Sequence, residues 1–276
     1  MTQKSVLITG CSEGGIGHAL AVEYQKRGLK VFATARNPSK IGDLTSLPNV
    51  IAIALDVTDP SSIAAAAKTV DAETGGKLDI LVNNAGVMYH MPVLDMDIAK
   101  AKQLYEVNVW GVISTTQAFA DMLVKAKGVV ANIGSIAGLS PLPLQAAYNS
   151  SKSAINNTSE VLRLELAPLG VRVLTVLTGG VTSEIENNAE KVVLPENSYY
   201  RSIEKDIQPS SNWTGLPADK YAEWLTDKTL DGKSTGQIWK GESTGLVRWV
   251  GPFLPQWLFD YLLIAHTKGF GKMQPL

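Results

Sequence analysis

The chain has 276 residues, 45% of them hydrophobic, and is therefore long enough to bury a substantial core. Its formal net charge of −1 argues against nucleic acid as a partner, because there is no broad electrostatic attraction to a polyanion. Cys11 is the only cysteine, which excludes an internal disulfide, and the three histidines are too scattered for a local zinc motif.

The amino-terminal segment leads directly into an apolar run. It lacks the long apolar core and the small-residue cleavage site of a signal peptide. Together with the single cysteine, this predicts a cytoplasmic protein.

Apolar runs alternate with stretches of helical spacing along the first 180 residues. The runs are almost continuously hydrophobic, as in strands that are buried on both faces, and helices between them supply the crossovers. This pattern predicts an α/β fold, a doubly wound parallel (Rossmann) sheet in a single domain. The predicted strands are 5–9, 30–34, 50–55, 79–84, 128–134 and 171–177, and two of the predicted helices are 96–125 and 147–168.

The predicted domain covers residues 1–276 and has three parts. Residues 1–185 form the Rossmann core. Residues 186–245 hold a substrate loop and the last strand, because 186–217 turns polar and loses its period. Residues 246–276 form an apolar C-terminal segment.

The stretch TGCSEGGIG, residues 9–17, connects the first predicted strand to a predicted helix. Glycine is favoured where the backbone turns sharply or where a ligand must approach it closely. Backbone N–H groups at the start of a helix bind phosphate, aided by the helix dipole. The spacing completes neither G-x-G-x-x-G nor a nucleoside-triphosphate P-loop, so a plain tight turn stays an alternative.

With this turn, the chain resembles the short-chain dehydrogenase/reductase family, whose usual fingerprint is TGxxxGxG. Thr9, Gly10, Gly15 and Gly17 match that fingerprint with one extra residue, and we expect Gly14 to absorb the bend. Three further family motifs follow in order, and the resemblance covers about the first 185 residues. They are LDVTD at 55–59, NNAG at 83–86 and NVWG at 108–111.

The segment YNSSK, residues 148–152, places a phenol and an ammonium on one face of a predicted helix. On its own this is an ordinary exposed pair. Ser135 and Asn108 lie at the separations of the family's catalytic tetrad, so the resemblance implies that Asn108, Ser135, Tyr148 and Lys152 are catalytic. Taken singly, Ser135 and Asn108 are more simply explained by local backbone hydrogen bonds.

Carbonyl reduction requires hydrogen-bond donors for the developing oxyanion, and then a proton. Tyr148 is the expected proton donor, and a neighbouring ammonium should lower the pKa of its phenol. The resemblance implies that Lys152 also holds the nicotinamide ribose, that Ser135 binds the substrate oxygen and that Asn108 keeps a water in a proton relay.

The end of the second strand bears on the choice of cofactor. An acidic residue there would bind the ribose hydroxyls of NAD, whereas a cation accommodates a 2′-phosphate. FATARNPSK offers Thr34 and Arg36 but no acid, which predicts NADP(H). Glu13 counts against it, since some NADP-using relatives carry a basic residue in the glycine turn.

The resemblance implies a full set of cofactor contacts, with Asp56 bordering the adenine. One departure lies at the nicotinamide end, where Thr178 replaces the family's proline and Ser183 its threonine, so we expect a looser turn. No metal is expected. The implied contacts are Gly10, Ser12, Gly15, Ile16, Gly17, Thr34, Arg36, Asp56, Val57, Asn84, Ala85, Gly86, Tyr148, Lys152, Val181 and Ser183.

Within the family, the glycine turn, VFATARNP and the apolar tail look most like fungal 1-acyldihydroxyacetone-phosphate reductases and relatives of 17β-hydroxysteroid dehydrogenases. The favoured function is therefore NADPH-dependent reduction of an apolar or lipid-like ketone, in a homo-oligomer. Two alternatives stay open: a dinucleotide-binding sensor without turnover, and another redox step such as alcohol oxidation or imine reduction. The substrate itself does not follow from the fold.

The tail, residues 246–273, is interrupted by prolines and Asp260, so a membrane-spanning helix is not expected. Its aromatic and aliphatic residues recur at helical spacing, which favours a helix that covers the substrate cleft or packs on a second subunit. The alternative is peripheral attachment to the endoplasmic reticulum or a lipid droplet, since tryptophans, a tyrosine and flanking cations suit a membrane surface. The residues concerned are Phe253, Trp257, Tyr261 and Ile264 in the stripe, with Trp249, Arg248, Lys268 and Lys272.

Overall fold

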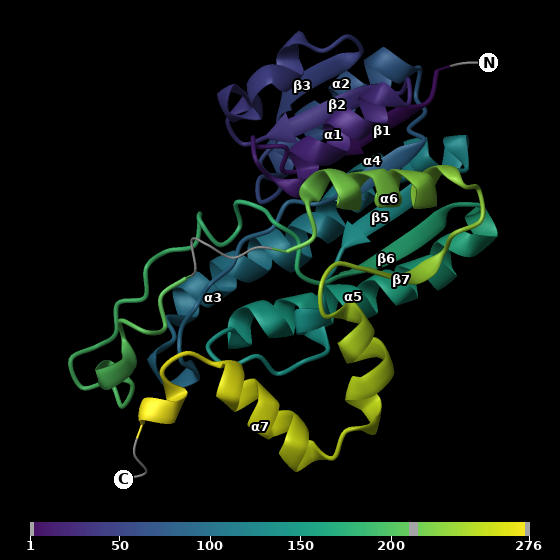
Figure 1. Cartoon of the computed structure of the whole chain (residues 1–276). Coiled ribbons are helices and arrows are strands. Elements are labelled where there is room, and N and C mark those ends of the chain that lie inside the picture. The colour runs from purple at the N-terminus through teal and green to yellow at the C-terminus, as the bar shows by residue number, and fades with distance from the viewer. Residues whose placement is uncertain (1–2, 210–214, 274–276) are drawn as a thin grey trace.

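The computed structural model describes residues 3–209 and 215–273. Seven parallel strands form one sheet in the order β3-β2-β1-β4-β5-β6-β7, with helices on both faces (Figure 1). This confirms the predicted doubly wound sheet. The strands are β1 Ser5–Ile8, β2 Lys30–Ala35, β3 Val50–Ala54, β4 Ile80–Asn83, β5 Val129–Ile133, β6 Arg172–Thr178 and β7 Gly236–Lys240. The α-helices are α1 Ile16–Lys26, α2 Pro60–Thr74, α3 Ile98–Tyr105, α4 Gly111–Ala126, α5 Ala146–Leu166, α6 Ala218–Leu230 and α7 Gln256–His266.

Alternating side chains of each strand fill two separate cores. In β1, Val6 and Ile8 pack beneath α1 and α6, whereas Leu7 packs on the opposite face with α2 and α4. Successive strand residues point to opposite faces, so strands buried on both faces read as continuous apolar runs. The six strands predicted from sequence therefore lie where expected, to within one residue at each end.

The boundaries of α2 show how local sequence sets the elements. Asp59 accepts a hydrogen bond from the Ser61 amide as N-cap, and Pro60 occupies the first helical position, where no donor is needed. The helix ends at Gly75, whose φ of 63° is left-handed.

Two helical predictions need correction. The predicted helix 96–125 is interrupted by a π-turn at Glu106–Trp110, which joins α3 to α4. Helix α6, between the substrate loop and β7, was not predicted; Tyr221, Ala222 and Leu225 bury its inner face against α1.

The substrate loop after β6 has a small core of its own. Val192, Leu194, Ile203 and Ile207 are buried together, and Phe270 of the C-terminal segment packs against them. The tail therefore leaves β7, passes through α7 and returns to this loop (Figure 1). Residues 210–214 of the predicted loop lie outside the described residues.

Helix α7 forms where the apolar spacing predicted a helix, but the stripe faces outward. Phe253, Trp257, Tyr261 and Ile264 are 84%, 71%, 65% and 50% exposed. The single chain therefore does not bury this stripe, and the substrate cleft, a second subunit and a membrane surface all stay predictions for what it contacts. In the described part of the chain, no helix is both long and apolar enough to cross a bilayer.

Candidate active site

The glycine-rich turn follows β1, where the strand order reverses between β2-β1 and β4. Ligands of doubly wound sheets bind at this point, beyond the carboxyl ends of the strands. Gly14 has a φ of 77° and takes the bend of the longer turn, as expected. A methyl group on Gly17 would lie 2.4 Å from the Gly10 carbonyl oxygen, so only glycine lets α1 begin this close to the turn.

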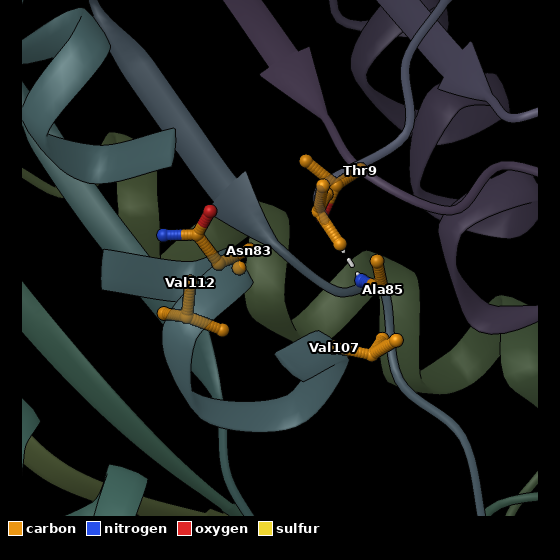
Figure 2. Close-up of a pocket in the computed structure, with 7 residues that line it drawn as sticks. Thr9, Asn83, Ala85, Val107 and Val112 are labelled. Atoms are coloured by element: carbon orange, nitrogen blue, oxygen red, sulfur yellow. Dashed lines mark hydrogen bonds between the residues drawn. The ribbon is translucent and has the colours of Figure 1, made fainter. Parts of the chain in front are cut away.

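The NNAG turn after β4 is fastened to the glycine-rich turn. Thr9 Oγ1 accepts hydrogen bonds from the amides of Asn84 and Ala85, both at 2.9 Å, the second of which Figure 2 shows. Asn84 Nδ2 donates to the Thr9 and Gly10 carbonyls, also at 2.9 Å. The gap behind this turn, lined by Thr9, Ala85 and residues of α4, does not admit a water-sized sphere, so it is a packing gap and not a ligand site.

The residues around these turns fit a dinucleotide. Gly15 is the N-cap of α1 and makes no side-chain cap, which leaves the first amides of the helix for a phosphate. Arg36 is exposed at the end of β2, and Asp56 follows β3 with its Oδ1 held by the Thr58 amide. Thr34 is buried and donates its hydroxyl hydrogen bond to the Ile8 carbonyl, so its side chain supports β1.

The turn after β6 is firm, which corrects the expected looseness at the missing proline. Thr178 shares a hydrogen bond of 2.6 Å with the Tyr221 hydroxyl of α6. The Gly179 amide donates to the Lys240 carbonyl, and Gly180 pairs with Glu242 in an antiparallel bridge. A hydroxyl and a neighbouring strand therefore restrain this turn in place of a proline ring. Val181 and Ser183 follow directly, and the next residue, Glu184, lies against Gly14 across the site.

Asn108 lies in the π-turn between α3 and α4. Its Oδ1 accepts from the Val87 amide and its Nδ2 donates to the Val87 carbonyl, each at 2.9 Å. The same Nδ2 lies 3.2 Å from Ser151 Oγ. Single π-turns inside helices are frequent at functional sites, and here the turn brings the carboxamide to the NNAG segment.

Ser135 follows β5 and is fixed by Asn156 of α5, a residue that the sequence analysis missed. Asn156 Nδ2 donates to the Ser135 carbonyl at 2.9 Å, and its Oδ1 accepts from the Ser135 amide at 3.3 Å. Asn156 is four residues after Lys152, on the same face of α5, which was the available sequence signal.

Tyr148 and Lys152 project from α5 into the space between Ser135 and Asn108. Lys152 Nζ lies 5.7 Å from the centre of the Tyr148 ring and donates to the Ile133 carbonyl at 2.8 Å. A methyl group on Gly86 would lie 3.4 Å from Asn108 Oδ1 and 3.8 Å from Lys152 Nζ, so both groups face one small space. The structure thus brings all four predicted tetrad residues together.

Burial dominates the protonation of both groups. It raises the pKa of Tyr148 to about 12, opposed by a hydrogen bond with Ser135 and reinforced by the negative charge of Glu186. Burial also lowers the pKa of Lys152 to about 8. In the chain alone, the net shift of the Tyr148 pKa is upward, because desolvation outweighs the interactions that favour the phenolate.

The wall around Tyr148 is apolar. Leu104, Ala137 and Tyr148 are buried together, and five partly buried residues pack against them. A carbonyl compound beside Tyr148 would therefore contact mainly hydrocarbon and aromatic side chains. The five residues are Val87, Met88, Tyr89, Tyr105 and Leu142.

Comparison with known proteins agrees with this geometry. The sequence profile described as "short chain dehydrogenase" matches residues 4–193. The chain belongs to the short-chain dehydrogenase family. Similarity to members of the family continues beyond the matched residues, over nearly the whole chain.

Two curated relatives and two crystal structures illustrate the similarity. Short-chain dehydrogenase cctT of Talaromyces islandicus is 44% identical, with 94% of each chain covered. The NADPH-dependent 1-acyldihydroxyacetone phosphate reductase of Schizosaccharomyces pombe is 37% identical, with 94% of this chain and 92% of that protein covered. A short-chain dehydrogenase from Streptomyces avermitilis has a TM-score of 0.78 at 28% identity, covering 89% of this chain and 91% of that one. One from Burkholderia cenocepacia, in complex with NADP, has a TM-score of 0.70 at 25% identity, covering 92% and 98%.

Proposed function

We propose that this short-chain dehydrogenase is an NADPH-dependent reductase of apolar ketones. The observation that carries the proposal is the convergence of Asn108, Ser135, Tyr148 and Lys152 in one small space beside an apolar wall. A bound nicotinamide would supply the hydride. Ser135 donates a hydrogen bond to the substrate oxygen, and Tyr148, protonated at neutral pH, transfers its proton to that oxygen.

Lys152 stabilises the phenolate that Tyr148 leaves behind and binds the nicotinamide ribose. Asn108 holds the relay that returns a proton to Tyr148, since it shares the space at Gly86 with Lys152. The start of α1 would hold the pyrophosphate, since the Ile16 and Gly17 amides lie in its first turn, whereas the Gly15 amide donates to the Ser12 carbonyl at 3.1 Å.

Arg36 supports NADPH as the cofactor, because it is an exposed cation at the end of β2 with no acidic residue beside it. Glu13 is the residue of the glycine-rich turn that counts against NADPH, and its carboxylate lies against Gly42. The similarity to an NADPH-dependent reductase of Schizosaccharomyces pombe and to a Burkholderia cenocepacia enzyme in complex with NADP is consistent with this choice.

The proposal is tested by measuring NADPH oxidation in the presence of candidate substrates. The candidates are ketosteroids, acyl-dihydroxyacetone phosphates and polyketide-like ketones. We expect turnover of at least one ketone class, with formation of the alcohol. Tight NADPH binding without turnover of any ketone, alcohol or imine would favour the alternative, a dinucleotide-binding sensor.

The pKa of Lys152 predicts the pH dependence of the reaction. Lys152 is charged below about pH 8 and neutral above it, whereas Tyr148 keeps its proton far beyond that pH. We expect kcat/KM for ketone reduction to be level at neutral pH and to fall above about pH 8, measured by NADPH oxidation. In Lys152→Arg, whose charge does not titrate, the residual activity should lose this decline. A rate that stays level in the wild type until the protein unfolds would contradict the role of Lys152.

The exposed stripe on α7 supports contact with a lipid surface. Trp249, Trp257 and Tyr261 are side chains that favour the bilayer interface. Arg248 stacks on Trp249 before α7, and Lys268 is exposed after it. Such a contact would place this cytoplasmic reductase at the endoplasmic reticulum or a lipid droplet. The chain also forms a homo-oligomer, for which the exposed Val161 and Leu164 of α5 offer a separate apolar surface.

Flotation of the full chain with phosphatidylcholine–phosphatidylserine vesicles tests the membrane contact. We expect the wild type to float with the vesicles and Trp257→Glu, an exposed and therefore tolerated substitution, to stay below. Leu164→Glu is the matched control. It should still float with the vesicles, but light scattering should show a lower molecular mass because the oligomer dissociates. If Trp257→Glu instead dissociates the oligomer, and the wild type does not float, the stripe is a subunit interface.

A further inference from the structure

Two polar side chains beside the tetrad have no part in the mechanism above. His90 follows the NNAG turn, and Glu186 lies in the loop after β6, so they come from segments that are far apart in the sequence. His90 Nε2 lies 3.2 Å from Glu186 Oε2, with the side chains only 9% and 20% exposed. This contact does not meet the geometry of a hydrogen bond, and Nε2 has no hydrogen-bond partner among the described residues.

The neighbours of His90 place the pair at the edge of the substrate space. Tyr89 packs in the apolar cluster around Tyr148, and Met91 packs against the core of the substrate loop. The charge of Glu186 acts on Tyr148, raising the pKa of the phenol, so the carboxylate lies near the hydroxyl. His90 Nε2 is therefore a buried polar atom without a hydrogen bond, beside the Glu186 carboxylate, in a wall that is otherwise apolar.

Leaving buried polar atoms without hydrogen bonds is costly, which favours a ligand that satisfies them. The carboxylate of Glu186 only accepts hydrogen bonds, whereas a protonated His90 nitrogen donates one. A hydroxyl group both donates and accepts, so it can bind the two together. A phosphate or carboxylate would be repelled by Glu186, and an ammonium group could not accept from the imidazole.

We propose that His90 and Glu186 form a subsite for a neutral hydroxyl of the substrate, so that the enzyme prefers ketones carrying an alcohol or phenol at a distance from the reacting carbonyl. The subsite rests on the proposed reductase function, since the carbonyl is placed at Ser135 and Tyr148. It narrows the substrate class to uncharged hydroxyketones. The apolar cluster holds the carbon skeleton between the two ends.

α-Tetralone, its ring-hydroxylated isomers and its ring-carboxylated isomers test the subsite, because they share one skeleton. In the wild type with NADPH, at least one hydroxylated isomer should exceed α-tetralone in kcat/KM by about tenfold, the worth of one hydrogen bond to a charged group. At each ring position, the carboxylated isomer should have a lower kcat/KM than the hydroxylated isomer and than α-tetralone itself.

The ratio of kcat/KM between that hydroxylated isomer and α-tetralone should fall to near one in His90→Phe and in Glu186→Gln. Glu190→Gln is the matched control, since it lies in the same loop with its carboxylate on Lys100, and it should keep the wild-type ratio. A ratio that survives in both subsite variants, or a wild type without any hydroxyl preference, would overturn the subsite.

Binding measurements separate failure of the subsite from failure of the reductase. If no tetralone is reduced, calorimetric titration of the same compounds into the protein with NADP⁺ gives a second readout. If a hydroxylated isomer binds more tightly than α-tetralone, and this difference is lost in Glu186→Gln, the result supports the subsite. Only the proposed ketone reduction would then be contradicted. Equal binding of hydroxylated and plain α-tetralone would overturn the subsite itself.

Discussion

Tyr148→Phe is expected to lower kcat for ketone reduction by roughly 10³-fold, because general-acid catalysis contributes about that much. The substitution removes one hydroxyl from a buried position and leaves the aromatic ring in its apolar cluster. NADPH binding should change little, since Tyr148 is only one of the many cofactor contacts expected and the phosphates are held by other residues. Stopped-flow or steady-state rates of NADPH oxidation, together with fluorescence titration of NADPH, separate the two effects.

Tyr199→Phe is the matched control for this substitution. Tyr199 is 70% exposed in the substrate loop, so loss of its hydroxyl should leave both kcat and NADPH affinity at wild-type values. If Tyr148→Phe reduced ketones at close to the wild-type rate, the proton would have to come from another group, and the role given to Tyr148 would be wrong.

Arg36→Asp should weaken NADPH binding by about 10- to 100-fold, since it replaces a charge-assisted contact to the 2′-phosphate with a repelling carboxylate. NADH binding should change little, because NADH carries no phosphate at that position. The measurement is parallel titration of the protein with both cofactors at one ionic strength.

Lys68→Asp provides the same change of charge at an exposed position of α2, and it should leave both affinities unchanged. Equal weakening of NADPH and NADH in Arg36→Asp would show that Arg36 supports the structure of the β2 end. The choice of NADPH would then need another explanation.

Much of the fold followed from the sequence because the strands are buried on both faces. Runs such as Ser5–Ile8 and Arg172–Thr178 have no solvent-exposed face and are therefore mostly apolar, and the glycine-rich turn marks the end of the first. The π-turn around Asn108 was not predictable from periodicity, since it depends on hydrogen bonds to Val87, a partner distant along the chain. Helix α6 was missed because its buried face mixes Tyr221, Ala222 and Leu225 with threonines.

The candidate site also has a part that could be predicted from the sequence and a part that could not. The spacing of Ser135, Tyr148 and Lys152 is local and could be recognised in the sequence. Asn156, which fixes Ser135, and the pair of His90 and Glu186 depend on which loops meet in space. The outward stripe of α7 shows the limit of an amphipathic pattern, which predicts a helix with one apolar face but not what that face contacts.

The central claim is that these residues direct hydride from NADPH to a ketone carbon. The most direct measurement uses NADPH that carries deuterium at the transferable position of the nicotinamide, with a ketone found in the screen. The account predicts an alcohol with one deuterium on the carbinol carbon, formed in step with NADPH oxidation by the wild type and nearly absent in Tyr148→Phe. NADPH oxidation that yields no deuterated alcohol, or deuterated alcohol at equal rates from both proteins, would contradict it.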